Sequence, residues 1–162
     1  MNCKKTFKNE EVIIVEEFNT LEAVKELFNK VNCVGNENCY FVVYKDTSKN
    51  LGMVKGMEYP YDALLINQTE NGLGVFYLQQ GGVPLKYDLS KMSLDENSYF
   101  FIKNEEIKSI TVKNWAIFNS KTKRIVIKLN NKKVHQLYAN IKEKLIPYQS
   151  EYFSKFIEKY SK

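Results

Sequence analysis

Acidic residues are absent from one long stretch of the sequence, residues 107–142. This stretch carries nine basic residues, whereas residues 1–106 carry eleven lysines against sixteen acidic residues. Residues 143–162 carry four lysines against three acidic residues, so the net charge of +5 comes from one basic segment beside an acidic body. A surface of one sign attracts the opposite sign, and this segment is therefore the feature that points to a partner.

Arginine is almost absent, because Arg124 is the only arginine among the 24 basic residues. Sequence-specific readers of nucleic acids favour arginine, whose planar guanidinium group forms paired hydrogen bonds with bases. The abundance of lysine, together with 17 asparagines, is also typical of AT-rich coding sequence. Nucleic acid therefore ranks as an expected partner behind a protein and behind an anionic membrane surface.

The residues that most enzymes and metal sites require are scarce. His135 is the only histidine, and a single histidine in a predicted strand is usually structural. The cysteines at positions 3, 33 and 39 form no CxxC pair, and their spacing with His135 matches no metal site. Adjacent acidic pairs such as Glu105-Glu106 point apart along an extended chain and do not converge on a substrate. We therefore expect no enzymatic activity, no cofactor and no metal.

Long hydrophobic runs are also lacking, since the longest aliphatic runs are the four-residue segments 12–15 and 63–66. The N-terminal residues lead into no apolar segment, so neither a signal peptide nor a membrane span is predicted. The odd number of cysteines, without paired spacing, favours a reducing compartment over a disulfide scaffold. The expected location is the cytoplasm.

Hydrophobic periodicity in the first part of the chain predicts a strand, a helix and a second strand. Residues 11–17 have a β-branched centre and form the first predicted strand. Asn19 or Thr20 then caps a helix whose apolar residues follow helical spacing and which is expected to end near Gly35. Residues 40–44 form the next predicted strand, and 46–56 have the composition of a loop. We interpret residues 1–58 as a small αβ elaboration and residues 59–162 as the main domain.

From residue 61 onward the pattern predicts strands almost throughout. Runs 61–68 and 73–79 flank Glu70-Asn71-Gly72, and an Asn-Gly pair between apolar runs indicates a hairpin because both residues tolerate a positive φ. Residues 90–97 are predicted to be a polar connection. Residues 115–118 form either a separate strand or a continuation of the preceding strand across a bulge. The other predicted strands are residues 83–88, 98–103, 107–113, 123–129 and 133–138.

Residues 121–133 predict a basic hairpin with a tight turn at Asn130-Asn131. Isoleucine and leucine alternate along 123–129, which places these apolar side chains inward and Arg124 and Lys128 outward. An alternative is that these lysines only solubilise the surface and protect edge strands from aggregation. The candidate residues for binding an anionic partner are Lys121, Lys123, Arg124, Lys128, Lys132 and Lys133.

The C-terminal residues predict an amphipathic helix that begins near Pro147, where the missing proline N–H is tolerated. Residues 140–146 are either an earlier helix kinked at Pro147 or a loop. The apolar stripe of the predicted helix consists of Tyr152, Phe153, Phe156, Ile157 and Tyr160.

About seven short antiparallel strands followed by one amphipathic helix form an order that resembles the pleckstrin-homology-like (PH-like) barrel. The run FFIKNEEIKSI at residues 100–110 resembles bacterial versions of this domain, in which a short strand leads into a strand with the pattern I-x-x-I. The resemblance covers approximately residues 60–161. It implies an α+β, mainly β fold, in which two antiparallel sheets form a barrel closed by the C-terminal helix.

With this resemblance, our first hypothesis is a non-catalytic cytoplasmic module that binds or scaffolds a partner protein. Some eukaryotic members of the superfamily bind phosphoinositides through basic residues between their first two strands. Here that loop, Thr69-Glu70-Asn71-Gly72, is short and acidic, so no such site is transferred. The alternative hypothesis is a peripheral protein that binds an anionic surface, either a membrane or nucleic acid, through the basic hairpin 121–133.

Overall fold

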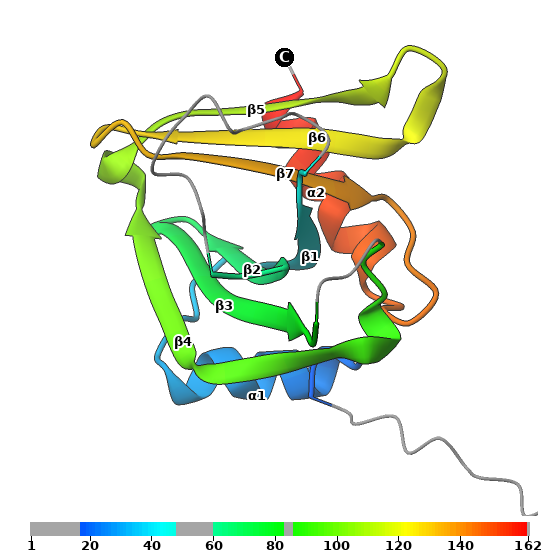
Figure 1. Ribbon diagram of the computed structural model, residues 1–162. Helices are drawn as coiled ribbons and strands as arrows, with labels where there is room; N and C mark the ends of the chain where they lie inside the picture. Colours follow the sequence, from blue (N-terminus) through cyan, green and yellow to red (C-terminus); the bar gives the residue numbers. More distant parts are fainter. Residues whose placement is uncertain (1–16, 48–59, 83–85, 162) are drawn as a thin grey trace, which may run out of the picture.

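The computed structural model describes residues 17–47, 60–82 and 86–161. Within these residues seven antiparallel strands form one sheet with the order β4-β3-β2-β1-β7-β6-β5 (Figure 1). The strands are β1 (Cys39–Lys45), β2 (Ala63–Thr69), β3 (Gly72–Gln80), β4 (Met92–Lys103), β5 (Ile107–Ala116), β6 (Asn119–Leu129) and β7 (Val134–Asn140). The helices are α1 (Leu21–Lys30) and α2 (Gln149–Tyr160), with the short 3-10 helices η2 (Leu89–Lys91) and η3 (Asn104–Glu106).

The mainly β, α+β class that the sequence predicts is confirmed, but the sheet is open. Strands β4 and β5 are its two edges, and η3 joins them along the chain without hydrogen bonds that would close the sheet. Figure 1 shows the sheet bent so that β5, β6 and β7 lie above β2, β3 and β4, with α2 beside β1. Strand β1, from the segment interpreted as an N-terminal elaboration, lies at the centre of the sheet between β2 and β7.

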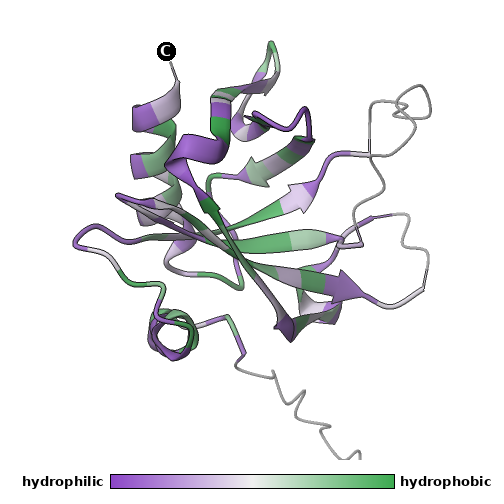
Figure 2. Cartoon of the chain, turned by 90° about the vertical axis from the view of Figure 1, so that its left-hand side faces the viewer, coloured by the Kyte–Doolittle hydropathy of each residue, from purple (hydrophilic) through white to green (hydrophobic). Residues whose placement is uncertain are grey.

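Two hydrophobic cores cover the two faces of the central strands. Successive side chains of a strand point to opposite faces, so Phe41 and Val43 enter the core that contains α2, whereas Tyr40 and Val42 enter the core that contains α1. Both faces are therefore buried, which explains why β1 and the first four residues of β2 are almost continuously apolar. In Figure 2 both helices carry hydrophobic and hydrophilic residues, as expected for amphipathic helices that cover one face.

Helix α1 begins where the sequence predicts and ends earlier. The hydroxyl group of Thr20 accepts a hydrogen bond from the Ala23 N–H at 3.2 Å, which caps the helix. Val24 and Phe28 are buried on the face toward the sheet. The helix ends at Lys30 rather than near Gly35, because Asn32 already takes a positive φ of 54° and turns the chain.

The β2–β3 hairpin is confirmed, with a different reason for its glycine. Thr69 pairs with Gly72, so Glu70 and Asn71 form the loop, and Asn71 does not have a positive φ. Gly72 has a φ of 153°, and a Cβ atom there would collide with the carbonyl oxygen of Ile102 on β4. Glycine is required because the neighbouring strand passes so close to its backbone.

The predicted polar connection at 90–97 is wrong, because most of it belongs to β4. Met92 pairs with Gln80 and Leu94 with Leu78, and both β4 residues pack into the core that contains α1. Strand β4 is an edge strand, so its other side chains can be polar and exposed, which hides the strand pattern.

The structure also decides the two alternatives that the sequence left open. Strand β5 continues through Trp115 across an irregularity in its pairing with β6. Residues 140–146 form no helix but contain an isolated bridge between Glu143 and Ile146. The strand predicted at 83–88 lies partly outside the described residues, and Lys86–Asp88 do not form a strand. The strand predicted at 11–17 lies outside them except for Glu17.

The C-terminal stripe is confirmed as part of the core. Phe153 and Phe156 are buried against Phe41 of β1, with ring centroids 5.4 and 4.6 Å apart respectively. The other three stripe residues, Tyr152, Ile157 and Tyr160, are half-buried against the same core. In the described part of the chain, no helix has the length and apolar character needed to cross a membrane.

Candidate functional site

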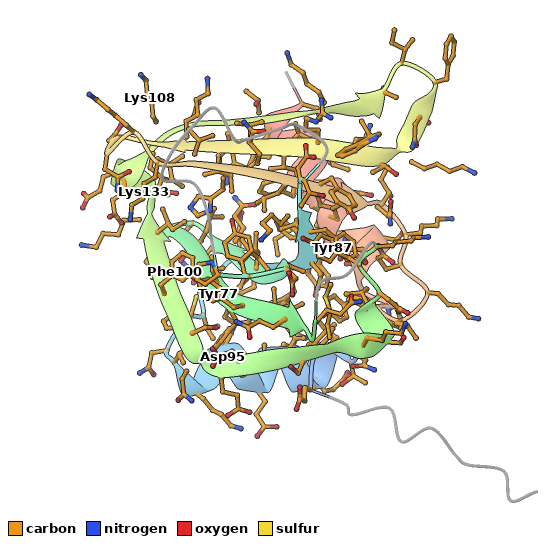
Figure 3. All side chains as sticks on the ribbon, viewed as in Figure 1. Tyr77, Tyr87, Asp95, Phe100, Lys108 and Lys133 are labelled. Atoms are coloured by element: carbon orange, nitrogen blue, oxygen red, sulfur yellow. The ribbon has the colours of Figure 1, made fainter. Side chains whose placement is uncertain are left out.

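The six predicted binding residues do not form one patch. Lys121 and Lys123 lie near the start of β6, whereas Lys128 lies near its end and Lys132 and Lys133 follow in the β6–β7 turn. Seven residues of extended strand separate Lys121 from Lys128 by roughly 23 Å. That spacing exceeds the screening length of about 8 Å at physiological ionic strength, so the two groups act separately. Figure 3 shows Lys133 near Lys108 at the turn end, on the other side of the molecule from Tyr87.

Arg124 is engaged within the protein and does not point freely outward. Its Nε lies 3.1 Å from the Asp46 Oδ2 atom, and Asp46 is fully buried. Its guanidinium carbon also lies 4.6 Å from the ring centroid of Trp115. The sequence could not show this pairing, because the two charged residues are 78 positions apart.

The lysines at the turn end are exposed, and Lys133 lines the same small cavity as Glu106. Asn130 donates from its backbone N–H to the carbonyl of Glu106 and from its side chain to the carbonyl of Glu105. These hydrogen bonds hold the turn against η3, whose two glutamates are exposed. The negative charges reduce the attraction of this end for an anion.

A surface cavity of about 910 Å³ lies at the opposite end of the sheet. Strands β1, β5, β6 and β7 form its floor, and the segment before η2 and the loop between β7 and α2 form its walls. Figure 1 shows the β5–β6 hairpin, the β7–α2 connection and η2 on the same side of the molecule. This cavity, called the aromatic cavity below, is lined by four aromatic residues: Tyr44, Tyr87, Trp115 and Tyr138.

The four aromatic rings form a continuous row. Tyr87 stacks on Tyr44 with centroids 6.2 Å apart, and Tyr44 stacks on Tyr138 at 5.0 Å. Trp115 meets Tyr138 edge to face at 4.9 Å. Burial raises the pKa of Tyr138 to about 12. Burial also raises the pKa of Tyr44, and the neighbouring Glu143 carboxylate adds to this increase. The phenols therefore stay neutral, and the row provides an aromatic wall of the cavity.

Charged residues surround this wall. Lys86, Lys91 and Lys144 line the cavity beside the carboxylates of Asp88 and Glu143. Glu143 Oε1 accepts hydrogen bonds from the Tyr44 hydroxyl at 2.9 Å and from the Asn140 side chain at 2.7 Å.

Asp88 is held by its own neighbours. It accepts hydrogen bonds from the side chain and backbone of Ser90, which lower the pKa of its carboxyl group. Asp88 also forms an ion pair with Lys91, whose Nζ lies 3.8 Å from its Oδ2 atom, and Lys86 and Lys144 are exposed.

His135, Cys33 and Cys39 lie outside this cavity. His135 is buried, and its Nδ1 lies 2.8 Å from the Tyr61 hydroxyl. Burial and the nearby Lys133 lower the pKa of His135 to about 4, so the ring is neutral at physiological pH. Cys33 and Cys39 are free, buried thiols, and burial raises the pKa of Cys39 to about 12. Among the described residues, no group of three or more His, Cys, Asp or Glu could hold a metal ion.

A smaller cavity of about 590 Å³ lies at the turn end of the sheet. Tyr77, Phe100, His135 and Lys133 are among the residues that line it. Of the six predicted binding residues, only Lys133 lines either of these two cavities. Its lining offers one exposed lysine near an exposed glutamate, Glu106. The aromatic cavity is larger and has three lysines, so it is the stronger candidate.

Comparison with known proteins adds no relative to these observations. No protein-family model matches the chain, and no curated protein or solved structure is significantly similar to it. Sequence reasoning missed the aromatic cavity because its four rings come from four separate elements and form no motif.

Proposed function

We propose that this chain is a non-catalytic binding module of the bacterial PH-like type. The order of the seven antiparallel strands, the bend that brings β5–β7 over β2–β4 and the helix that follows β7 support this assignment. In this proposal α2 fills the space between the two halves of the sheet, and α1 with the preceding residues is the N-terminal elaboration. Binding rather than catalysis is supported by His135, whose ring is buried, neutral and bonded to Tyr61.

The aromatic cavity is the proposed binding site, and its partner is an acidic segment of another protein. The observation that carries this proposal is the row of four rings beside three lysines in a cavity of about 910 Å³. A volume of this order accommodates several side chains, and aromatic rings that already pack on one another give contact area at low entropic cost. The three exposed lysines outnumber Asp88 and Glu143, so the lining carries a net positive charge that attracts carboxylates.

The proposed location is the cytoplasm. Cys33 and Cys39 are both unpaired and buried, which suits a reducing compartment.

The test is an affinity capture from a lysate of the source organism with two matched triple variants. Lys86/Lys91/Lys144→Glu reverses the charge of the aromatic cavity, and Lys128/Lys132/Lys133→Glu reverses the same number of charges at the turn end. Both variants are expected to fold, because all six side chains are exposed. We expect a partner captured by the wild type to be lost with the first variant and kept with the second.

The opposite result would move the site to the turn end, which carries three of the six residues that the sequence predicted. If both variants still captured the partner, a charged binding site at either end would be contradicted. A second measurement separates contact from charge: Tyr87→Ala shortens the aromatic row while keeping all lysines. This substitution should weaken binding of the isolated partner about tenfold or more if the row is the contact surface.

A further inference from the structure

Two large apolar residues, Ile117 and Phe118, form the tip of the β5–β6 hairpin and are almost entirely exposed. Their exposed fractions are 89% and 99%, whereas Val34, the other exposed large hydrophobic residue in the described part of the chain, reaches 49%. Ala116 pairs with Asn119, so Ile117 and Phe118 are the two loop residues of the hairpin. Figure 1 shows this hairpin extending beyond the end of β7.

The turn itself does not require these two residues. Two-residue hairpin loops favour asparagine and glycine, whereas isoleucine and phenylalanine are poor turn formers. Neither residue has a positive φ, and Asn119 fixes the start of β6 by accepting hydrogen bonds from the N–H groups of Lys121 and Thr122. An apolar pair exposed on a well-formed turn therefore calls for a partner outside the domain.

The hairpin behind the tip carries charge of one sign. Lys113 on β5 and Lys121 and Lys123 on β6 lie within about five residues of the tip, and the whole segment 107–142 has no acidic residue. Lys121 lies three residues behind Phe118, a distance of about 10 Å along an extended strand. An interfacial element buries its apolar side chains about 5–10 Å below the headgroups, so this spacing places the lysines at the headgroup level.

We propose that the β5–β6 hairpin attaches the protein to an anionic membrane surface. Ile117 and Phe118 insert into the boundary between headgroups and acyl chains, and Lys113, Lys121 and Lys123 bind the anionic headgroups. A bilayer suits the tip better than a protein surface does, because lysine is depleted from the cores of protein interfaces but remains hydrated beside headgroups. The attachment goes beyond the function proposed above and does not depend on what the aromatic cavity binds.

The first experiment measures co-sedimentation of the full chain with vesicles of phosphatidylcholine, with and without about one third phosphatidylserine. We expect binding to the anionic vesicles, weak binding to the neutral ones, and a steep decrease as salt is raised above physiological ionic strength. Equal binding to both vesicle types, or binding to neither, would overturn the proposal.

The decisive variant is Ile117→Asn/Phe118→Gly, which replaces the apolar tip with two residues that are common in exposed turns. Both side chains are almost entirely exposed, so this protein should fold like the wild type, while its partition onto anionic vesicles falls at least about tenfold. The charge variant Lys113/Lys121/Lys123→Gln should lower partition about a hundredfold, since each lysine near the surface contributes a factor of about five. Val34→Ser is the matched control for loss of an exposed apolar side chain, and it should bind like the wild type.

Insertion itself is measured with Phe118→Trp. The wild type contains only Trp115, which is half-buried against Tyr138, so its emission serves as the background. We expect the added tryptophan to shift to shorter wavelengths with anionic vesicles and to be quenched by brominated lipid. Binding that persists in Ile117→Asn/Phe118→Gly, or that a soluble polyanion abolishes without any emission shift, would show charge attraction alone and overturn the insertion.

Discussion

The guanidinium group of Arg124 on β6 lies 3.1 Å from the carboxylate of Asp46, which follows β1 and is fully buried. The pair crosses β7, which lies between these two strands in the sheet. Arg124 is one quarter exposed, so the pair joins a buried anion to a cation at the surface of the protein. One residue of the acid-free segment therefore stabilises the centre of the sheet, although the sequence places it in a binding patch.

Substitution of Arg124 should therefore lower the free energy of unfolding, whereas substitution of Lys121 or Lys123 should leave it nearly unchanged. Arg124→Gln takes a partner from a buried carboxylate, and we expect the free energy of unfolding to fall by about 3 kcal/mol. Lys121→Gln and Lys123→Gln should stay within about 0.5 kcal/mol of the wild type. The measurement is urea denaturation of the three variants, together with Asp46→Asn and the Asp46→Asn/Arg124→Gln double variant. Additive effects in this cycle would show that the two residues do not interact.

Phe156 connects α2 to the sheet. It is buried, and its ring centroid lies 4.6 Å from that of Phe41 and 4.7 Å from that of Tyr160. Phe156→Ala should lower the free energy of unfolding by about 3–5 kcal/mol, because it removes a buried ring and leaves a cavity. Glu158→Ala, on the exposed side of the same helix, should change it by less than about 0.5 kcal/mol. Equal thermal midpoints for the two variants would mean that α2 does not pack as described.

The pKa of His135 predicts a loss of stability in mild acid. Burial and Lys133 lower this pKa from the usual 6.5 to about 4, so the unfolded chain binds a proton at higher pH than the folded protein does. Between these two values the unfolded state binds more protons, and the free energy of unfolding therefore falls as the pH is lowered. The linkage amounts to about 3 kcal/mol between pH 7 and pH 4.

The matched variant is His135→Gln, which can still form a hydrogen bond with the Tyr61 hydroxyl. Other acid-sensitive groups remain in both proteins, so the difference between their stability profiles isolates the histidine. We expect the variant to lack the His135 contribution in this pH window. An NMR titration of the wild-type ring with a midpoint near 6.5 would contradict the buried, neutral state.

Local periodicity explains which elements could be predicted. The alternation of Ile125 and Ile127 along β6 and the stripe of α2 reflect burial of one face, and both are correct. Strand β4 was missed between residues 92 and 97 because an edge strand has an exposed face, and its pairing with β3 leaves no local signal. The central position of β1 is likewise set by non-local pairing with β2 and β7.

The candidate site could be predicted less well than the fold. Tyr44 and Tyr138 meet only because β1 pairs with β7, and Tyr87 joins them from a segment before η2. The exposed tip had a signal, since Ile117 and Phe118 are apolar residues within a basic segment, but together with Trp115 and Ala116 they also fit a strand. Only the exposure of these two side chains distinguishes a tip from a buried strand, and exposure is known only from the folded structure.

Lys132 provides a test of backbone conformation at the β6–β7 turn. Its φ is 71°, in the left-handed region, which costs about 1–2 kcal/mol for a residue with a side chain. Lys132→Gly removes this strain, and the greater freedom of glycine in the unfolded chain offsets about 0.4–1 kcal/mol of the gain. We therefore expect the free energy of unfolding to rise by about 0.5 kcal/mol. Lys133→Gly, the neighbouring lysine without a positive φ, should lower it by a similar amount. Urea denaturation distinguishes these outcomes, and a decrease in both variants would contradict the left-handed conformation of Lys132.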